Sequence, residues 1–168
     1  MKVILYMAIS ANGMIAKAND NTAWISETEW NSYASIVKQS GCLIVGRRTY
    51  HILTKQPEFA DLKDVKLVVV SKSEFTTIAP NHFVVSSLKE ALEKVKEFAS
   101  VIVAGGSILN SSFIKEDLVD EIYLDIEPIV LGKGIKLFDD GDFEKELELL
   151  ETKQLSKDEI QLHYKIIR

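Results

Sequence analysis

Residues 42–50 read Cys42-Leu43-Ile44-Val45-Gly46-Arg47-Arg48-Thr49-Tyr50, and this stretch carries the clearest signal of the fold. Its first four residues form a short apolar run, which predicts a buried strand. The glycine and the polar residues after it predict a turn that leads into a helix. The same order of strand, turn and helix recurs along the chain, so the sequence predicts an α/β fold with a parallel sheet.

Short apolar runs rich in β-branched residues recur along the chain and predict its strands. Each run is four to seven residues long, which is the usual length of a strand in a folded domain. The six predicted strands cover residues 3–9, 42–45, 66–71, 82–85, 100–104 and 121–127.

Two segments between these strands carry apolar residues at the i, i+3, i+4, i+7 spacing of an amphipathic helix. In each segment a serine is followed three residues later by a glutamate, which predicts a capping box at the helix start. The residues are Ser26 and Glu29 with the apolar set Trp30, Tyr33, Ala34 and Val37, and Ser87 and Glu90 with the apolar set Leu88, Ala91, Leu92 and Val95.

The C-terminal segment has a different pattern. Residues 147–155, a polar turn at 156–158, and apolar residues at every second position from Ile160 to Ile166 predict an antiparallel hairpin. We therefore expect a mostly parallel central sheet with a C-terminal antiparallel hairpin and helices on both faces. No repeat and no low-complexity linker divides the chain, so residues 1–168 are expected to form a single domain.

Composition narrows the range of functions. The chain has 168 residues, 46% of them hydrophobic, and its 20 basic and 25 acidic residues give a net charge of −5. Scattered basic residues in an acidic chain argue against nucleic-acid binding. No long apolar run or signal peptide is present, so we expect a soluble, cytoplasmic protein with no membrane partner. Cys42 is the only cysteine, and the three histidines lack metal-binding spacing, so no metal site is expected.

Ligands of open α/β sheets bind at the carboxyl ends of the strands, and three turns there could hold an anion. Arg47 and Arg48 stand at a helix N-terminus, where a bound phosphate would offset their unfavourable position against the helix dipole. Ser71 and Lys72 follow the next strand, and together with Arg47 they suggest a 2′-phosphate and hence NADP. Solvent-facing arginines and a plain surface turn explain these two stretches about equally well.

The third turn is Ala104-Gly105-Gly106-Ser107, followed by Ile108 at the start of an apolar-periodic segment. Two glycines between a strand and a helix permit positive φ and let a pyrophosphate approach the backbone. A tight turn without a ligand is the alternative. Three such turns in one sheet are stronger evidence than any one of them.

Glu29 is the candidate for proton transfer. It lies one turn into a predicted helix among Trp24, Trp30 and Tyr33, and aromatic neighbours that exclude water raise the pKa of a carboxyl group. A purely structural role as the capping partner of Ser26 is the alternative.

These residues, taken together, resemble the dihydrofolate reductase superfamily. Within it the sequence is most similar to the riboflavin-biosynthesis reductase, which is the C-terminal domain of the bifunctional deaminase-reductase. The resemblance spans nearly the whole chain in order. The segments that carry it are Met7-Ala8-Ile9-Ser10 with Asn12-Gly13, Trp24-Ile25-Ser26, Gly46-Arg47-Arg48-Thr49-Tyr50, Gly105-Gly106, Val119-Asp120-Glu121, and Pro128-Ile129-Val130-Leu131-Gly132-Lys133-Gly134 with Leu137-Phe138.

The resemblance implies a three-layer dihydrofolate-reductase-like fold and an NADPH-dependent reductase, commonly a homodimer, that acts on a small heterocycle. It places the 2′-phosphate at Arg47 and Ser71, the pyrophosphate at Thr49 and the Gly105-Gly106 turn, and the nicotinamide near Ala8 and Ile15. Trp24 and Tyr33 would line the substrate pocket, with Glu29 as the proton-relaying carboxylate. The full expected cofactor set is Ala8, Ile15, Gly46, Arg47, Arg48, Thr49, Ser71, Lys72, Ala104, Gly105, Gly106, Ser107 and Ile108.

Three functions stay open at this point. The leading hypothesis is reduction of the ribosylamino-pyrimidinone of riboflavin biosynthesis. Riboflavin reductase domains, however, usually carry a glutamate where this chain has Ala104. Reduction of dihydrofolate is favoured by Glu29 and Trp24. The third is a dimeric protein that binds NADPH without turnover.

Overall fold

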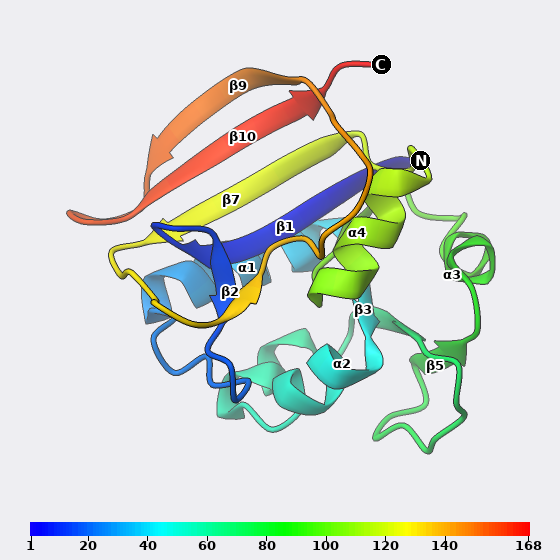
Figure 1. Cartoon of the computed structure of the whole chain (residues 1–168). Helices are drawn as coiled ribbons and strands as arrows, with labels where there is room; N and C mark the ends of the chain where they lie inside the picture. Colours follow the sequence, from blue (N-terminus) through cyan, green and yellow to red (C-terminus); the bar gives the residue numbers. More distant parts are fainter.

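The computed structural model describes all 168 residues. Its centre is an eight-stranded sheet in the order β5-β4-β3-β6-β1-β7-β10-β9 (Figure 1). The six strands from β5 to β7 are parallel to their neighbours, whereas β10 pairs antiparallel with both β7 and β9. Their bounds are β1 Lys2–Ser10, β3 Cys42–Gly46, β4 Lys66–Val70, β5 His82–Val85, β6 Ser100–Val103, β7 Glu121–Glu127, β9 Leu147–Gln154 and β10 Ile160–Ile166.

Helices cover both faces of the sheet, as the alternation of strands and helices predicts. One core cluster packs α3 and α4 against one face, and a second packs α1, α2 and the 3-10 helix η1 against the other. The helices are α1 Glu27–Ser40, α2 Arg47–Leu53, η1 Pro57–Leu62, α3 Leu88–Lys94 and α4 Ser107–Lys115.

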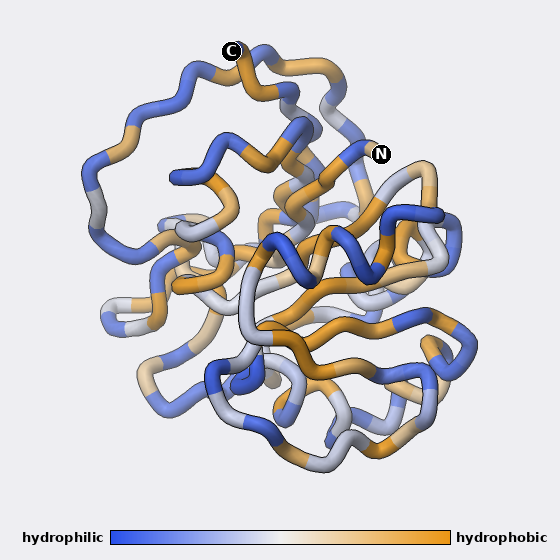
Figure 2. The backbone as a smooth tube through the Cα atoms, turned by 90° about the vertical axis from the view of Figure 1, so that its right-hand side faces the viewer, coloured by the Kyte–Doolittle hydropathy of each residue, from blue (hydrophilic) through white to orange (hydrophobic).

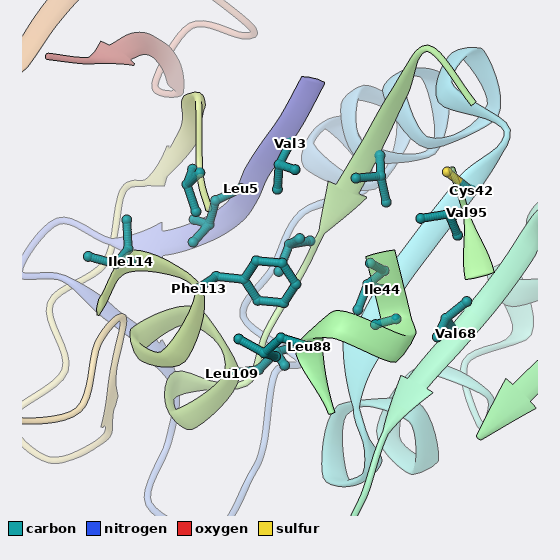
Figure 3. Close-up of a cluster of buried hydrophobic side chains, with 14 of the residues drawn as sticks. Val3, Leu5, Cys42, Ile44, Val68, Leu88, Val95, Leu109, Phe113 and Ile114 are labelled. Carbon is teal, nitrogen blue, oxygen red and sulfur yellow. The ribbon is translucent and has the colours of Figure 1, made fainter. Parts of the chain in front are cut away.

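The apolar strand runs lie in the interior, and hydrophilic segments lie mostly around them (Figure 2). On the α3 and α4 face, Phe113 of α4 points into a cluster with Leu5 of β1 and Ile44 of β3 (Figure 3). All three side chains are fully buried. Burial of such a side chain contributes about 1.5–3 kcal/mol to folding, so this layer holds α4 firmly against the sheet.

The predicted fold class is confirmed: a mostly parallel sheet, a C-terminal antiparallel hairpin and helices on both faces. Strand bounds agree with the predicted ranges to within one residue at most ends. Three short elements were not predicted. They are η1 and the two strands of a small second sheet, β2 Met14–Ala16 and β8 Ile135–Lys136.

The two predicted capping boxes form only in part, which corrects the sequence prediction. Ser26 Oγ accepts a hydrogen bond from the N–H of Glu29 at 3.0 Å, but the N–H of Ser26 donates to Glu127 Oε1 instead. At α3 the carboxylate of Glu90 accepts from the N–H of Ser86 rather than from that of Ser87. In both cases a neighbouring group competes for the reciprocal bond.

None of the helices has the length and apolar character needed to cross a bilayer.

Candidate functional site

A cavity of about 1130 Å³ opens at the carboxyl ends of the parallel strands. Ala8 of β1, Gly46 at the end of β3, Ser71 after β4 and Ala104 after β6 all line it. Because these strands are neighbours in the sheet, their carboxyl ends meet along one edge, which is where open α/β sheets bind ligands. Residues from α1, η1 and α4 complete its walls.

Two helices begin at this cavity without a side-chain cap. The N-caps of α2 and α4 are Gly46 and Gly106, and neither start has a side-chain hydrogen bond. The first N–H groups of a helix have no partner within the helix, so both starts leave backbone donors open. In α1 and α3, by contrast, a serine side chain accepts a hydrogen bond from one of these N–H groups. Together the two uncapped starts provide donors suited to an anion.

The Gly105-Gly106 turn packs closely against its surroundings. Gly105 has a φ of +85°, and a side chain there would meet Met7 at 3.3 Å. The N–H of Gly46 donates to the carbonyl of Gly105 at 2.7 Å, and Asn110 Oδ1 accepts from the N–H of Gly105 at 3.1 Å. Buried Asn110 also donates to the carbonyl of Leu137, so it fixes the turn from inside α4. The peptide bond between the two glycines is cis.

The basic side chains of the cavity lie near α2 and the carboxyl end of β4. The guanidinium of Arg47 stands over the ring of Phe75, 5.2 Å from its centroid. Lys72 lines the cavity directly after β4 and is exposed. Arg48 forms an ion pair with Asp20 at 2.6 Å, so this guanidinium already has a partner within the protein.

A buried tyrosine that sequence reasoning did not single out fixes the segment after β4. The hydroxyl of Tyr50 in α2 accepts from the N–H of Ile78 at 2.9 Å and lies 3.0 Å from His82 Nδ1. Burial lowers the pKa of His82, which keeps the ring neutral and able to accept this bond. Tyr50 thereby holds residues 71–81, which carry Ser71 and Lys72, against α2.

Glu29 is buried at the cavity wall, with 5% of its surface exposed, and its carboxyl oxygens form no hydrogen bond within the protein. Its backbone N–H is capped by Ser26, but Glu127 takes the reciprocal bond. A capping role therefore does not occupy the carboxyl group. Burial, followed by the charges of Asp125, Glu127 and Glu159, raises the pKa of Glu29 well above its ordinary value. Such a carboxyl group holds a proton over a wider pH range and can donate it.

Two polar networks underlie Glu29, and both join strands to α1. In the first, Asp125 of β7 accepts from the Tyr6 hydroxyl and, at 2.8 Å, from Gln161 Nε2 of β10. In the second, Glu127 Oε1 accepts from the N–H of Ser26 at 2.8 Å, and Glu159 accepts from the Ser26 hydroxyl. The N-terminus of α1 is thus anchored to the carboxyl end of β7.

The loop after β1 is tied to a distant segment rather than free. Asn12 donates from Nδ2 to the carbonyl of Leu131 at 2.8 Å and accepts from the N–H of Leu131 at 3.1 Å. A side chain on Gly134 would lie 2.6 Å from the carbonyl oxygen of Ala16, so only glycine allows β8 to approach β2. These contacts place Ile15, which is 8% exposed, in the cavity wall.

The structure brings most of the expected residues to this one cavity. Two expected residues, Trp24 and Gly105, do not line the cavity. The indole N–H of Trp24 donates to the carbonyl of Asn21 instead. Trp30, in contrast, does line the cavity. Asp139 also lines the cavity and accepts a hydrogen bond from the Ser107 hydroxyl at 2.9 Å. The run of acidic residues and glycine at 139–142 is, by its sequence alone, typical of a solvated turn. The expected residues that line it are Ala8, Ile15, Glu29, Tyr33, Gly46, Arg47, Arg48, Thr49, Ser71, Lys72, Ala104, Gly106, Ser107 and Ile108.

Sequence reasoning missed the residues that support this site from a distance. Asn110, Tyr50, Asp125 and Gln161 each make buried side-chain hydrogen bonds that orient a cavity wall. Their signal in the sequence is a polar residue within an otherwise apolar helix or strand face. Their partners, however, lie up to 155 positions away in the chain.

The fold and its cavity define the class of protein. A mostly parallel eight-stranded sheet that ends in an antiparallel hairpin is the fold of the dihydrofolate reductase superfamily. A solved dihydrofolate reductase from Enterococcus faecalis, complexed with NADP(H), superposes with a TM-score of 0.75 over 98% of this chain and 96% of its own, at 16% identity. A putative riboflavin biosynthesis protein from Shewanella sp. PV-4 gives a TM-score of 0.82 over 100% of both chains, at 20% identity.

Sequence comparison gives the family. The chain belongs to the family of the RibD C-terminal domain, whose model matches residues 1–161. It is 32% identical to the uncharacterized protein YwjB of Bacillus subtilis, over 97% of both chains. It is also 34% identical to dihydrofolate reductase type 1 of Escherichia coli, over 76% of this chain and 78% of that protein. These similarities support a reductase of the riboflavin or dihydrofolate reductase type.

Proposed function

We propose that this protein is an NADPH-dependent reductase that transfers hydride to a pyrimidine- or pterin-type heterocycle. One observation carries the proposal. A single cavity combines uncapped helix starts and basic side chains with a buried, unpartnered carboxyl group at Glu29. The first half suits a dinucleotide phosphate, and the second suits proton delivery to a heterocycle.

The residues present fit NADPH. The open N–H groups at the starts of α2 and α4 would bind the pyrophosphate, with Thr49 beside the glycine turn. Arg47, Ser71 and Lys72 would bind the 2′-phosphate, since guanidinium, hydroxyl and ammonium groups are its usual donors. Buried Ala8 and Ile15 would form the apolar wall beside the nicotinamide. The bound cofactor supplies the hydride, and the protein supplies orientation.

Glu29 would hold a proton at its carboxyl group and donate it toward the substrate. Trp30 and Tyr33, whose ring centroids lie 5.5 Å apart, flank Glu29 on α1 and limit its contact with water. The exclusion of water keeps the pKa of Glu29 raised, so the same side chains that shape the pocket keep the proton available.

Two substrates fit this class. Membership of the RibD C-terminal domain family supports the riboflavin-type substrate, 5-amino-6-(5-phosphoribosylamino)uracil or a close analogue. The buried Glu29 and the 34% identity to a dihydrofolate reductase support dihydrofolate.

Binding of NADPH and NADH tests the cofactor. The tryptophan fluorescence, which comes from Trp24 and Trp30, should be quenched in a saturable way by NADPH and much less by NADH. Arg47→Ala should weaken NADPH binding by at least about ten-fold, because a charge-assisted hydrogen bond to the 2′-phosphate is lost, and NADH binding by less than about three-fold. Lys63→Ala is the matched control, because Lys63 is exposed and does not line the cavity.

Equal losses for the two cofactors in Arg47→Ala would contradict the 2′-phosphate assignment. Absence of binding by either cofactor would contradict the reductase proposal as a whole. Binding of NADPH without oxidation by any pyrimidine or pterin would favour a nucleotide-binding protein without turnover.

A further inference from the structure

Carboxyl groups line the part of the cavity that α1 and η1 form, and we name this part the acidic wall: Glu27 and Glu29 of α1 with Glu58 and Asp61 of η1. The two elements are in contact, because the indole N–H of Trp30 donates to Asp61 Oδ2 at 3.2 Å. Glu27, Glu58 and Asp61 are exposed, whereas Glu29 is buried. No lysine, arginine or histidine of α1 or η1 lines the cavity.

Every basic side chain of the cavity belongs to other segments, at the start of α2 or directly after β4. Arg47, Arg48 and Lys72 are the only three. Arg48 is paired with Asp20 at 2.6 Å, and Arg47 is turned toward Phe75 in the segment after β4. The proposed function assigns Arg47 and Lys72 to the phosphate of the cofactor. No cation is therefore left for an anionic group on the substrate.

We propose that the acidic wall selects a neutral or cationic amino-heterocycle as substrate and rejects molecules that carry a phosphate or carboxylate tail. This inference rests on the proposed function and narrows its substrate class. It disfavours the phosphoribosyl form of the pyrimidine and the glutamate-tailed form of the pterin. Their tail-free counterparts are favoured.

The buried end of the acidic wall points to the same ligand chemistry. The residue Glu29 is 5% exposed, and its carboxyl oxygens accept no hydrogen bond within the protein. Because the residue lines the cavity, these oxygens are available to accept hydrogen bonds from a ligand. The amino and ring N–H groups of an aminopyrimidine or a pterin are donors of the required kind.

The exposed end repels anions. Glu27, Glu58 and Asp61 line the cavity with negative charge, and charges separated by less than about 10 Å interact strongly at low salt. Three further carboxyl groups line the cavity outside the acidic wall: Asp20, which is paired with Arg48, and Glu116 and Asp139, of which Asp139 accepts a hydrogen bond from Ser107.

Two matched pairs of ligands test the selection in the protein saturated with NADP⁺. The first pair is 5-amino-6-ribitylaminouracil and its 5′-phosphate. The second is methotrexate dimethyl ester and methotrexate, which differ in the charge of the glutamate tail. Calorimetric titration should show the member without the anionic group binding at least about ten-fold tighter in each pair at low salt, with a smaller ratio at about 0.5 M salt because of screening.

The variant Glu58→Gln with Asp61→Asn removes two charges from the acidic wall and should reduce the ratio to within about three-fold. The amide oxygen introduced by Asp61→Asn can still accept the indole bond of Trp30. Asp64→Asn is the matched control, because Asp64 is exposed and does not line the cavity. Its ratio should equal that of the native protein.

Equal or tighter binding of the anionic members would overturn the charge selection and leave the proposed reductase function in place. An unchanged ratio in the double variant would overturn the role of the acidic wall. Failure of NADP⁺ to bind, or of every heterocycle to bind, would overturn the proposed function and this inference together.

Discussion

At the scale of single residues, Glu29 shows why a motif can be formed only in part. The sequence offers Ser26 and Glu29 as a capping box, and the backbone half of that box is present. Glu127, which is 101 positions away from Ser26, takes the other half at 2.8 Å. The Glu29 carboxyl group is thereby released from its capping role and remains unpartnered at the cavity wall.

The pH dependence of stability tests the buried state of Glu29. Because its pKa is raised in the folded protein, the unfolded chain loses the proton first as pH rises. The contribution of Glu29 to stability is therefore full below its ordinary pKa of 4.5 and is lost as pH rises through the folded value. Each unit of pKa shift costs about 1.4 kcal/mol. Relative to Glu29→Gln, the native protein should become progressively less stable with rising pH in urea unfolding.

Glu27→Gln, on the same turn of α1, is the control for this measurement because Glu27 is exposed. It should leave the pH dependence close to that of the native protein. The same Glu29→Gln protein should lose turnover while keeping its affinity for NADPH. A Glu29→Gln protein with native pH dependence would contradict the buried, protonated carboxyl group.

At the scale of elements, the segment after β4 depends on one side chain of α2. Residues 71–81 contain no helix or strand, yet they carry Ser71 and Lys72 of the proposed phosphate site and Phe75, whose ring lies under Arg47. The hydroxyl of Tyr50 holds this segment through Ile78, and the Tyr50 ring packs 5.5 Å from Phe75. A short helix thus fixes the position of a loop whose own sequence specifies little structure.

Tyr50→Phe removes this anchor while keeping the ring. The N–H of Ile78 and the Nδ1 of His82 both lose their partner, so we expect a loss of about 1–3 kcal/mol in the free energy of unfolding. NADPH affinity should fall as well, because Ser71 and Lys72 are less well positioned. Urea unfolding and NADPH titration measure the two effects.

Tyr164→Phe is the matched control, since the hydroxyl of Tyr164 makes no hydrogen bond within the protein and the residue lies in β10, away from the cavity. It should change neither stability nor NADPH affinity by much. An unchanged NADPH affinity in a destabilised Tyr50→Phe protein would show that the anchor is structural only.

At the scale of the whole molecule, β9 is an edge strand with no residue buried. Leu147, Leu149 and Leu150 are 41%, 53% and 44% exposed, and Leu150 is the extra residue at the irregular point in the pairing with β10. Exposed apolar edge strands favour association with another chain. We therefore expect the homodimer that the family resemblance implies to form through the exposed face of this hairpin.

Light scattering tests the dimer. The native protein should have twice its chain mass of 18.9 kDa, and Leu149→Lys should reduce the mass to that of one chain because a charge would be buried in the contact. Thr76→Lys, at an exposed position outside both the hairpin and the cavity, controls for added charge alone. A monomeric native protein would contradict the expectation.

Local sequence pattern was sufficient for most of the fold. The apolar runs at 42–45 and 82–85 and the spacing of Trp30, Tyr33 and Val37 predicted β3, β5 and α1, because strand and helix periodicity act over neighbouring residues. The short pairing of β2 with β8 was not predictable in this way. It depends on a contact between Gly134 and Ala16, more than 100 positions apart.

The candidate site also has features that local sequence pattern predicts and features that depend on long-range contacts. The order of strands and turns along the chain was enough to predict that residues such as Arg47, Ser71 and Gly106 lie together at one edge of the sheet. Contacts between distant segments were needed to show that the Glu29 carboxyl group is unpartnered, that Trp30 rather than Trp24 lines the cavity, and that α1 and η1 contribute acidic but no basic side chains to it. The physical reason is range: periodicity and turn chemistry act between near neighbours, whereas burial, hydrogen bonding and charge depend on whatever the folded chain brings alongside.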